Sequence, residues 1–381
     1  MTNAVPAPDW DRLLRRVAGW FSIARLTAAR EDELCAFMIA AYRDQPAVGA
    51  FAADEQARRR MRWITDRNPV AFDDGRPAWL CLKDGRIVGH IGAMAADAVV
   101  DGRVVPICWG RDLIVAPEAR RLGAGPLLVM TAVREVARPF LVAGLNDDAH
   151  ALYRQLGFHE NGVIPVLINV RNAARLLETM PWPRLKRHAA ALALTVAQRV
   201  ANRPRRRGRA LTITPIERFD EEFDRWWAGV ESTFGCVVRR TAATLAWRYQ
   251  EHPSHAYGCY AARDERSLRG VIVVRHGRSR GLPAGFVSEF LVHPEDRTAA
   301  DSLLSHAVEA LSVSGADAPV FLRCTALNGA YEAALSRHGF LRAPSPLRWM
   351  SMHRDGVAAL GALAERERWL LTAGDGDLDM S

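Results

Sequence analysis

The pattern of hydrophobic and polar positions predicts the same order of elements in both halves of the chain. Residues 22–38 predict a short strand, a turn and an amphipathic helix, and residues 211–227 predict the same three elements. An arginine-bearing helical segment follows in each half, around Trp63 and around Trp247, and a proline ends it. This order is a first indication of an internal repeat.

The later strands repeat as well. Asp-Gly pairs at 84–85 and 101–102 separate apolar runs and predict hairpins, and residues 257–287 form a looser counterpart. A strand ended by proline follows in residues 111–120 and again in 288–297. In both halves a helix then begins after an asparagine and runs to a Gly-Phe pair. Matches in one order at so many points predict two copies of one α/β domain.

The repeat predicts four parts: an N-terminal domain at 1–170, a helical and arginine-rich linker at 171–210, a C-terminal domain at 211–370 and an acidic tail at 371–381. Residues 185–201 predict an amphipathic helix. We interpret it as a linker or domain-bridging helix in preference to a helix on an anionic membrane surface. We expect the tail to be frayed, the alternatives being that it caps an acceptor pocket or touches a cation.

Composition is that of an ordinary globular protein, with 381 residues of which 49% are hydrophobic and 25% charged. Six scattered cysteines without a Cys-x-x-Cys pair argue against a disulfide framework or a zinc site. His90, His150 and His159 are interpreted as surface or core residues, because none has a partner at ligand spacing. Charges interrupt any signal-peptide core near the N-terminus, and we find no uncharged apolar run of about 18 residues. We therefore expect a cytoplasmic protein without a metal site.

The chain is basic, with a net charge of +8, and arginine supplies nearly all of the positive charge because Lys83 and Lys186 are the only lysines. Such a chain can attract nucleic acid, anionic lipid or a phosphate-rich small molecule. Since carboxylates are plentiful too, we interpret the charge as a bias of composition. It does not favour nucleic-acid binding.

One loop combines the features of a phosphate site. Residues 119–129, Ala-Arg-Arg-Leu-Gly-Ala-Gly-Pro-Leu-Leu-Val, join a predicted strand end to a predicted helix start. The first N–H groups of a helix lack intrahelical partners, Gly123 and Gly125 let the backbone approach a bulky anion, and Arg120 and Arg121 add positive charge. The glycines match neither the dinucleotide fingerprint nor the P-loop. Taken alone, the loop fits a pyrophosphate site and a plain left-handed turn equally well.

Residues 114–158 resemble the cofactor core of the GNAT N-acyltransferases. That signature is a strand, a [Gln/Arg]-x-x-Gly-x-[Gly/Ala] loop that opens a helix, an asparagine at a strand end, and a helix with Leu-Tyr that ends in Gly-Phe. The matching residues are Arg120, Arg121, Leu122, Gly123, Ala124, Gly125, Asn146, Leu152, Tyr153, Gly157 and Phe158. The resemblance implies an α/β fold (α+β by some schemes) of two tandem GNAT-like domains, each a mixed, mostly antiparallel central sheet flanked by helices. The first copy alone carries the cofactor signature.

The resemblance also implies how a co-substrate would bind. The amides of residues 121–125 would hold the pyrophosphate of acetyl-CoA or another acyl-CoA. The strand edge at Leu113, Ile114 and Val115 would hydrogen-bond the pantetheine amides, as an added strand does. Asn146 would contribute side-chain hydrogen bonds.

Acylation of an amine needs an acid for the departing sulfur and a base for the amine proton. Tyr153 matches the tyrosine that protonates the leaving thiolate in the family. Asp112 is the candidate base because it lies just before the pantetheine-binding segment, while Trp109 or Gly110 aligns with the position at which relatives carry a glutamate. A chain of water molecules is the alternative to Asp112. Pro126 departs from the loop pattern, because proline has no N–H to donate.

The second copy lacks these features. In residues 295–304 other residues replace both glycines, and Asp301 puts a negative charge where the pyrophosphate would lie. Leu335 stands where Tyr153 stands in the first copy. We therefore expect no coenzyme in this copy, which would instead complete the acceptor site or cover the sheet edge of the first. Glu289, the counterpart of Asp112, is expected to be structural or to contact the acceptor.

These observations favour an acyl-CoA-dependent N-acyltransferase, above all an N-acetyltransferase, in which a primary amine of a small-molecule or sugar-linked acceptor attacks directly. Two hypotheses stay open beside it. An aminoacyl-tRNA-dependent transferase of the peptidoglycan-bridge type would suit the basic charge but would not need the intact glycine loop. A non-catalytic acyl-CoA-binding module would need the loop but not the acid. The acceptor pocket is expected to draw on residues 42–68 and on the second copy.

Overall fold

The computed structural model describes residues 15, 17–42, 54–72, 75–202, 211–265, 267–312, 315, 317–353 and 361–379. The chain forms two compact units. Unit 1 comprises Met1–Val163 and Pro346–Arg366, and unit 2 comprises Ile164–Ser345 and Glu367–Asp379. Each unit thus contains a segment from the opposite half of the sequence. This division differs from the linear one into 1–170, 171–210 and 211–370.

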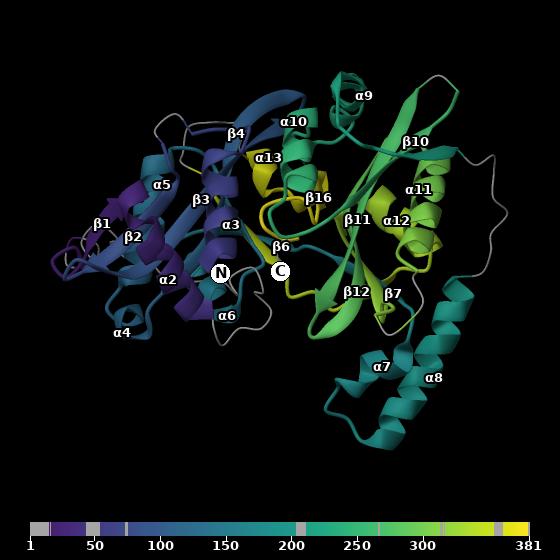
Figure 1. The fold of residues 1–381 in the computed structure, drawn as a ribbon, viewed down its shortest axis with the longest axis horizontal. Coiled ribbons are helices and arrows are strands. Elements are labelled where there is room, and N and C mark those ends of the chain that lie inside the picture. The colour runs from purple at the N-terminus through teal and green to yellow at the C-terminus, as the bar shows by residue number, and fades with distance from the viewer. Residues whose placement is uncertain are drawn as a thin grey trace, which may run out of the picture. The chain divides into compact units, whose positions relative to one another are not determined.

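Unit 1 is a single sheet with helices on both faces (Figure 1). Its strands are β1 (Ser22–Arg25), β2 (Ala78–Lys83), β3 (Arg86–Val100), β4 (Arg103–Val115), β5 (Phe140–Ala143), β6 (His159–Val163) and β15 (Arg348–Met352). Its helices are α2 (Glu31–Tyr42), α3 (Asp54–Asp66), α4 (Pro117–Arg120), α5 (Ala124–Val136), α6 (Asp147–Gln155) and α13 (Gly361–Ala364), after a 3-10 turn at Ala28–Arg30. The strands pair in the order β1-β2-β3-β4-β5-β15-β6, and only β4 and β5 are parallel in this path.

Unit 2 contains the remaining elements. Its strands are β7 (Val166–Val170), β8 (Thr212–Pro215), β9 (Cys236–Val238), β10 (Gly258–Arg263), β11 (Leu268–Ser279), β12 (Leu282–Val292), β13 (Phe321–Leu327), β14 (Leu341–Ala343) and β16 (Trp369–Thr372). Its helices are α7 (Ala173–Glu178), α8 (Arg184–Ala201), α9 (Glu221–Glu231), α10 (Ala242–Leu245), a π-helical turn at Ala246–Gln250, α11 (Arg297–Ala310) and α12 (Gly329–Arg337). A 3-10 turn at Arg366–Arg368 precedes β16.

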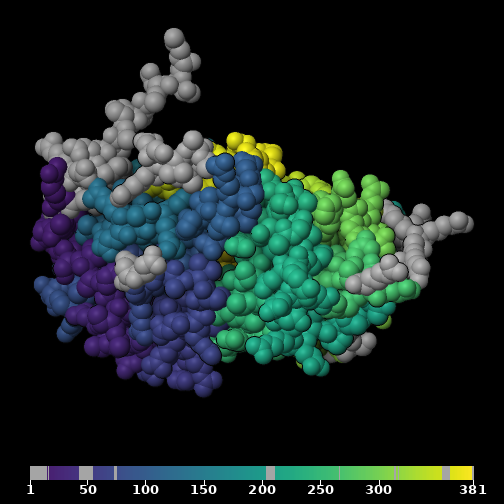
Figure 2. Space-filling model, turned by 90° about the horizontal axis from the view of Figure 1, so that it is seen from above, coloured from purple at the N-terminus to yellow at the C-terminus, as the bar shows by residue number. Residues whose placement is uncertain are grey.

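The two sheets have the same strand order. In unit 2 the path is β8-β10-β11-β12-β13-β7-β14, and again the parallel pair, β12 and β13, follows three antiparallel ones. The predicted mixed, mostly antiparallel sheets are confirmed in both units. In each sheet the strand next to the last comes from the opposite half of the sequence, β15 in unit 1 and β7 in unit 2. Figure 2 shows the molecule in a space-filling view, with the colour running by residue number from purple at the N-terminus to yellow at the C-terminus.

Side chains of β2 alternate between two cores in unit 1, as a strand covered on both faces requires. Trp79 and Cys81 pack with α5 and α6, whereas Leu80 and Leu82 pack with α2 and α3. Ile114 of β4 belongs to the core under α2 and α3. The end of β4 therefore lies between two helical layers, and side chains can approach it from either face.

The predicted helix at 185–201 is α8, and with α7 it forms a helical hairpin that packs beside β7 (Figure 1). Both helices belong to unit 2, so this part of the predicted linker is a component of a folded unit. The arginine-rich residues 203–210 lie outside the described part of the chain. None of the described helices combines the length and the apolar character that a membrane span requires.

Candidate functional site

Glycine builds the turn that joins α4 to α5. Gly123 adopts a φ of +89°, and an added Cβ would lie 2.9 Å from Cγ2 of Val17, so a larger residue would meet both backbone strain and a contact. α5 begins directly after it, and Gly123 has no side chain with which to cap the helix. The first N–H groups of α5 thus lack intrahelical partners. Pro126 lies inside this first turn, where a missing N–H costs the helix nothing.

The end of β4 diverges from its parallel neighbour. β4 pairs with β3 along most of its length, but with β5 only at Cys108 and Trp109. A register shift opposite Ile91 accompanies a positive φ of +50° at Asp112, which marks a bulge just before Leu113–Val115. Arg120 Nε donates to the carbonyl of Val115 at 2.9 Å and thereby ties the loop to the strand. The start of α5, which no side chain caps, therefore follows shortly after the end of β4, which no longer pairs with β5.

Asp112 lies in a buried cluster of charges on the α3 face of the sheet. Arg60 Nη1 of α3 donates to Asp112 Oδ2 at 3.0 Å, and Arg111 also forms an ion pair with this carboxylate. The Asp112 side chain is only 6% exposed. Burial raises the pKa of Asp112, but the charges of both arginines outweigh it and hold the pKa well below the usual range. So acidic a carboxyl group is a weak proton acceptor.

His90 lies beside the same bulge. Its Nδ1 is 3.1 Å from the backbone carbonyl of Asp112, and because a carbonyl only accepts, Nδ1 carries the proton. Burial, with the nearby charge of Arg111, lowers the pKa of His90 to about 4, so the ring is neutral at pH 7. This is the core histidine that the sequence predicts, and it fixes the backbone of the bulge.

Asn146 and Tyr153 lie on α6. Asn146 is exposed and caps the helix, because its Oδ1 accepts from the N–H of Ala149 at 2.8 Å. Tyr153 is 2% exposed and packs on Phe158 with ring centroids 4.8 Å apart. It belongs to the core on the α5 face, opposite the face on which Asp112 meets Arg60. The two candidate catalytic side chains thus lie on opposite faces of the sheet, one on each side of the β4 end.

In unit 2 the corresponding helix start is capped. Asp296 precedes α11, and its carboxylate accepts from the N–H of Ala299 at 3.0 Å. The charge predicted at Asp301 is in the wrong place, because α11 begins one turn earlier than expected and Asp301 pairs with Arg337 at 3.1 Å. The helix end therefore has its own anion, and Asp296 supplies it.

The end of β12 is also satisfied from within unit 2. The Tyr331 hydroxyl donates to the carbonyl of Val292 at 2.7 Å and accepts from its N–H at 2.9 Å. Tyr331 stands three residues after Asn328, which caps α12 as Asn146 caps α6. The residue three positions after Asn146 is Ala149, which has no hydroxyl.

The C-terminal segment lies where β12 and β13 diverge. These strands pair only from Ala284 to Val287 of β12. Beyond that point Thr372 of β16 pairs with Ala326 of β13. Gly374 then lies against β12, where an added Cβ would be 2.5 Å from Oε2 of Glu289. The place that corresponds to the diverging end of β4 is therefore filled by the chain itself.

The expectation of a frayed acidic tail is wrong for residues 372–379. Asp375 Oδ2 accepts from Arg240 Nη2 at 2.9 Å, and Asp379 pairs with Arg275 at 3.0 Å, with all four side chains at most 4% exposed. Arg240 also approaches Glu289 at 3.4 Å, which supports the structural role predicted for that carboxylate. The cations that the tail touches are arginines of unit 2.

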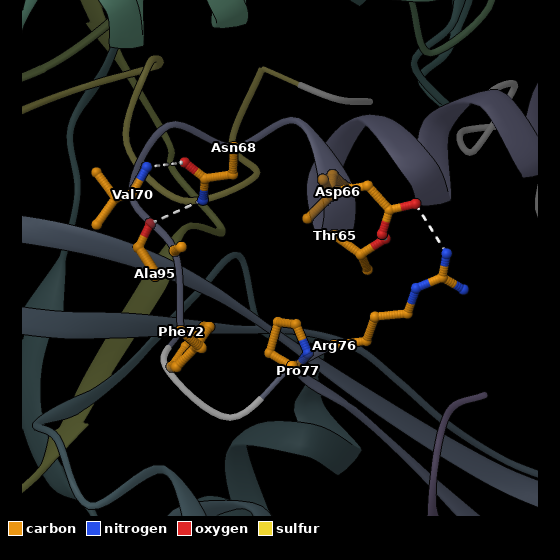
Figure 3. A pocket seen from close by; sticks show the side chains of 11 residues that line it. Thr65, Asp66, Asn68, Val70, Phe72, Arg76, Pro77 and Ala95 are labelled. Atoms are coloured by element: carbon orange, nitrogen blue, oxygen red, sulfur yellow. Dashed lines mark hydrogen bonds and ion pairs between the residues drawn. The ribbon is translucent and has the colours of Figure 1, made fainter. Parts of the chain in front are cut away.

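A pocket of about 250 Å³ opens in unit 1 between the end of α3 and β3 (Figure 3). Asn68 shapes it by donating to the carbonyl of Ala95 and accepting from the N–H of Val70, both at 3.0 Å. Asp66 accepts from Arg76 at 2.8 Å on its other side. Residues 64–68 belong to the stretch from which acceptor contacts are expected. Residues 43–53 of that stretch lie outside the described part of the chain.

Sequence reasoning missed the partners of Asp112. Arg60 stands in a run of three arginines, and only helical periodicity could have placed one of them on the inner face of α3. Arg111 precedes Asp112 directly, and a regular strand would have sent the two side chains to opposite faces. The bulge brings them together, and no residue pattern marks it.

Comparison with known proteins finds a family model that matches part of unit 1. The model of the acetyltransferase (GNAT) family matches residues 41–158. A GCN5-related N-acetyltransferase from Anabaena variabilis is similar in structure, at 13% identity and a TM-score of 0.58, over 87% of this chain and 72% of that one. Saccharomyces cerevisiae N-myristoyltransferase with bound myristoyl-CoA follows at 11% identity and a TM-score of 0.56, over 87% and 82%. No curated protein sequence matches. At such identities the structures establish the fold.

Proposed function

We propose that unit 1, whose residues 41–158 match the model of the acetyltransferase (GNAT) family, transfers an acyl group from acyl-CoA, above all acetyl-CoA, to a primary amine. The acceptor would be a small molecule or a sugar-linked amine. The observation that carries the proposal is the pairing of an uncapped helix start at Ala124 with a strand end that leaves its parallel neighbour. Anions bind at the first, and extended amide chains add to the second.

The residues fit the co-substrate at both places. The amides of residues 121–125 would hold the pyrophosphate, while Arg121, which is exposed, supplies positive charge. Leu113–Val115 would hydrogen-bond the pantetheine amides, and Asn146 is exposed at the start of α6. Gly125 lets the start of α5 lie close to α6, because an added Cβ would lie 3.3 Å from the Leu152 side chain.

Bound acyl-CoA would supply an activated thioester carbonyl. The amine nitrogen attacks this carbon, the new C–N bond forms and the C–S bond breaks. Tyr153 donates its proton to the departing sulfur and regains one from water, which also takes up the proton lost by the nitrogen. We assign Asp112 a positioning role, because its ion pairs with Arg60 and Arg111 stabilise the bulge. Its predicted role as the base is the alternative that substitution tests.

Unit 2 is not a second site in this proposal. Asp296 occupies the helix start, Tyr331 binds the strand end and the segment around Gly374 fills the divergence. Each contact replaces one part of the binding apparatus of unit 1. One acyl-CoA per chain is therefore expected.

The proposal is tested by thermal unfolding with acetyl-CoA. At a ligand concentration of 100 times the Kd, binding adds about 2.7 kcal/mol to the free energy of unfolding. Arg121→Glu should raise the Kd at least about tenfold, since a charge reversal beside the pyrophosphate is worth more than about 1.4 kcal/mol. Arg297→Glu makes the same change at the start of α11 and should leave the shift intact. Equal shifts in both variants, or no shift with any acyl-CoA, would contradict the proposal.

Tyr153→Phe separates an enzyme from a binding module. The variant should keep the thermal shift and lose roughly 10²–10⁴-fold in kcat, the range of general acid catalysis. Unchanged turnover would remove Tyr153 from the mechanism. Transfer from aminoacyl-tRNA without any response to acyl-CoA would favour the alternative donor.

A further inference from the structure

Helix α8 has one face that packs on unit 2. Gln198 is 5% exposed, and its Oε1 accepts from the N–H of Val170 at 3.0 Å. Its Nε2 donates to the carbonyl of Gly339 at 2.7 Å. These bonds set the rotation of the helix about its axis.

The opposite face of α8 exposes large apolar side chains. Leu185 is 84% exposed, Leu192 68%, Val196 51% and Val200 54%. Steps of seven, four and four residues place them on one side of a helix. Leu194, by contrast, lies near the packed face and is half-buried. These four residues, which we call the α8 stripe, form the main group of exposed large hydrophobic residues in the described part of the chain.

The charge around the α8 stripe has one sign. Arg184, Lys186, Arg187 and Arg199 lie on α8, and the sequence contains no aspartate or glutamate from Thr179 to Ile216. Lys186 lies over the ring of Trp182 at 4.7 Å, just before the helix, and Trp182 is 37% exposed. An apolar stripe with basic flanks and a tryptophan at its end is typical of a helix that lies in a membrane interface.

The same charge argues against a second copy as the occupant. Two α8 stripes packed together would bring eight basic side chains close, with no acidic residue on either helix to pair with them. An anionic surface gains from each of these charges. Apolar side chains on one face of a helix can also insert between the lipids of such a surface.

We propose that the α8 stripe docks on a membrane surface that contains anionic phospholipid. Leu185, Leu192, Val196 and Val200 enter the interface, while the arginines and Lys186 bind phosphate headgroups. The binding is peripheral and depends on salt. It would bring unit 1 to a surface without any change in its own residues.

The test is co-sedimentation of the full chain with vesicles. Vesicles of phosphatidylcholine with one part in three of phosphatidylglycerol should bind the protein, and vesicles of phosphatidylcholine alone should bind it at least about fivefold less. Leu192→Glu with Val196→Glu should abolish binding. Lys186→Ala should weaken it by roughly fivefold, the usual contribution of one basic residue near an anionic surface. Val104→Glu, at an exposed valine of β4, is the matched control and should bind like the wild type.

Two further measurements keep the result interpretable. Far-ultraviolet circular dichroism and the acetyl-CoA thermal shift should be the same in all variants, because the stripe takes no part in unit 1. Gel filtration should show the same size for the wild type and the double variant. No vesicle binding, equal binding to neutral vesicles, or a smaller assembly for the double variant would overturn the proposal. The last outcome would show a second copy as the occupant.

Discussion

Arg60 on α3 donates a 3.0 Å hydrogen bond to the carboxylate of Asp112 on β4, and both side chains are buried. The pair joins the helix to the bulge that precedes the proposed pantetheine-binding edge. With Arg111 as a second partner, the carboxylate balances charge inside the protein. Its role is therefore open to a stability measurement as well as a kinetic one.

Asp112→Asn tests that role. Asparagine tolerates the positive φ, so the change removes charge with little strain. Two buried guanidinium groups would lose their counter-ion, and we expect a loss of roughly 3–5 kcal/mol in urea unfolding. Asp97→Asn on β3 is the control. If Asp112 only positions the bulge, kcat of the folded variant should fall by less than about tenfold, whereas a general base would cost about 10²-fold or more.

His90 should make stability depend on pH. Burial lowers its pKa to about 4 in the folded protein, while an unfolded histidine titrates near 6.5. The unfolded state therefore binds the extra proton first, and stability falls as pH drops from about 6.5 to about 4. The loss from this group should reach roughly 3 kcal/mol.

Urea unfolding at pH 7 and pH 5 measures the part of this loss that falls above pH 5, roughly 2 kcal/mol, in the wild type, in His90→Asn and in His150→Asn. His90→Asn should reduce the difference between the two pH values. His150→Asn, at a half-buried histidine that lies 3.1 Å from Glu160, is the matched histidine substitution for comparison. Equal pH dependence in all three proteins would contradict the assignment.

Ala149→Tyr introduces into unit 1 a tyrosine at the position that Tyr331 occupies in unit 2. By analogy with Tyr331 and Val292, the new hydroxyl should bind the end of β4 and compete with acyl-CoA. We expect the Kd for acetyl-CoA to rise at least about tenfold by calorimetry, with the free energy of unfolding changed by less than about 1 kcal/mol. Tyr331→Phe should lose about 1 kcal/mol of stability and leave the Kd unchanged. An unchanged Kd in Ala149→Tyr would mean that the β4 edge does not bind the co-substrate.

Asp375→Ala tests the buried attachment of the C-terminal segment. Removing this carboxylate leaves Glu289, at 3.4 Å, as the remaining carboxylate among the described partners of Arg240, and breaking a buried pair costs roughly 3–5 kcal/mol. Glu309→Ala on the exposed side of α11 should change stability by less than about 0.5 kcal/mol. Equal unfolding midpoints in the two variants would contradict a structural role for the tail.

Ala95→Leu tests the pocket of Figure 3 as the acceptor site. Ala95 is 4% exposed and lines the pocket, so a larger side chain would reduce its volume. We expect the KM for the acceptor to rise while the thermal shift with acetyl-CoA stays the same. A KM like that of the wild type would place the acceptor elsewhere.

The repeat, the strands and the glycine loop could be predicted from local sequence patterns, because strand alternation, Asp-Gly turns and helix starts depend on neighbouring residues. The pairing of strands that lie far apart in the sequence leaves no such local pattern. β7 pairs in the sheet of unit 2 and β15 in the sheet of unit 1, each in the opposite half of the repeat. Both are short strands, and nothing in their sequences indicates this exchange. Asp375 and Asp379 look like exposed polar residues until Arg240 and Arg275, more than a hundred positions earlier, are placed beside them. The bulge at Asp112 could not be predicted either, because no local residue pattern marks it.

The exchange of β7 and β15 sets an order of events during synthesis. All strands of the path from β8 to β14 have been made once Ala343 leaves the ribosome, and β7 among them was made early. The sheet of unit 1 still lacks β15 at that moment, because Arg348–Met352 come later. Although domains made first generally fold first, here the sheet of unit 1 can be completed only after the strand path from β8 to β14 has been made. Unit 2 in turn is complete only after Glu367–Asp379 have been made, so the folding of both units depends on segments that are made late.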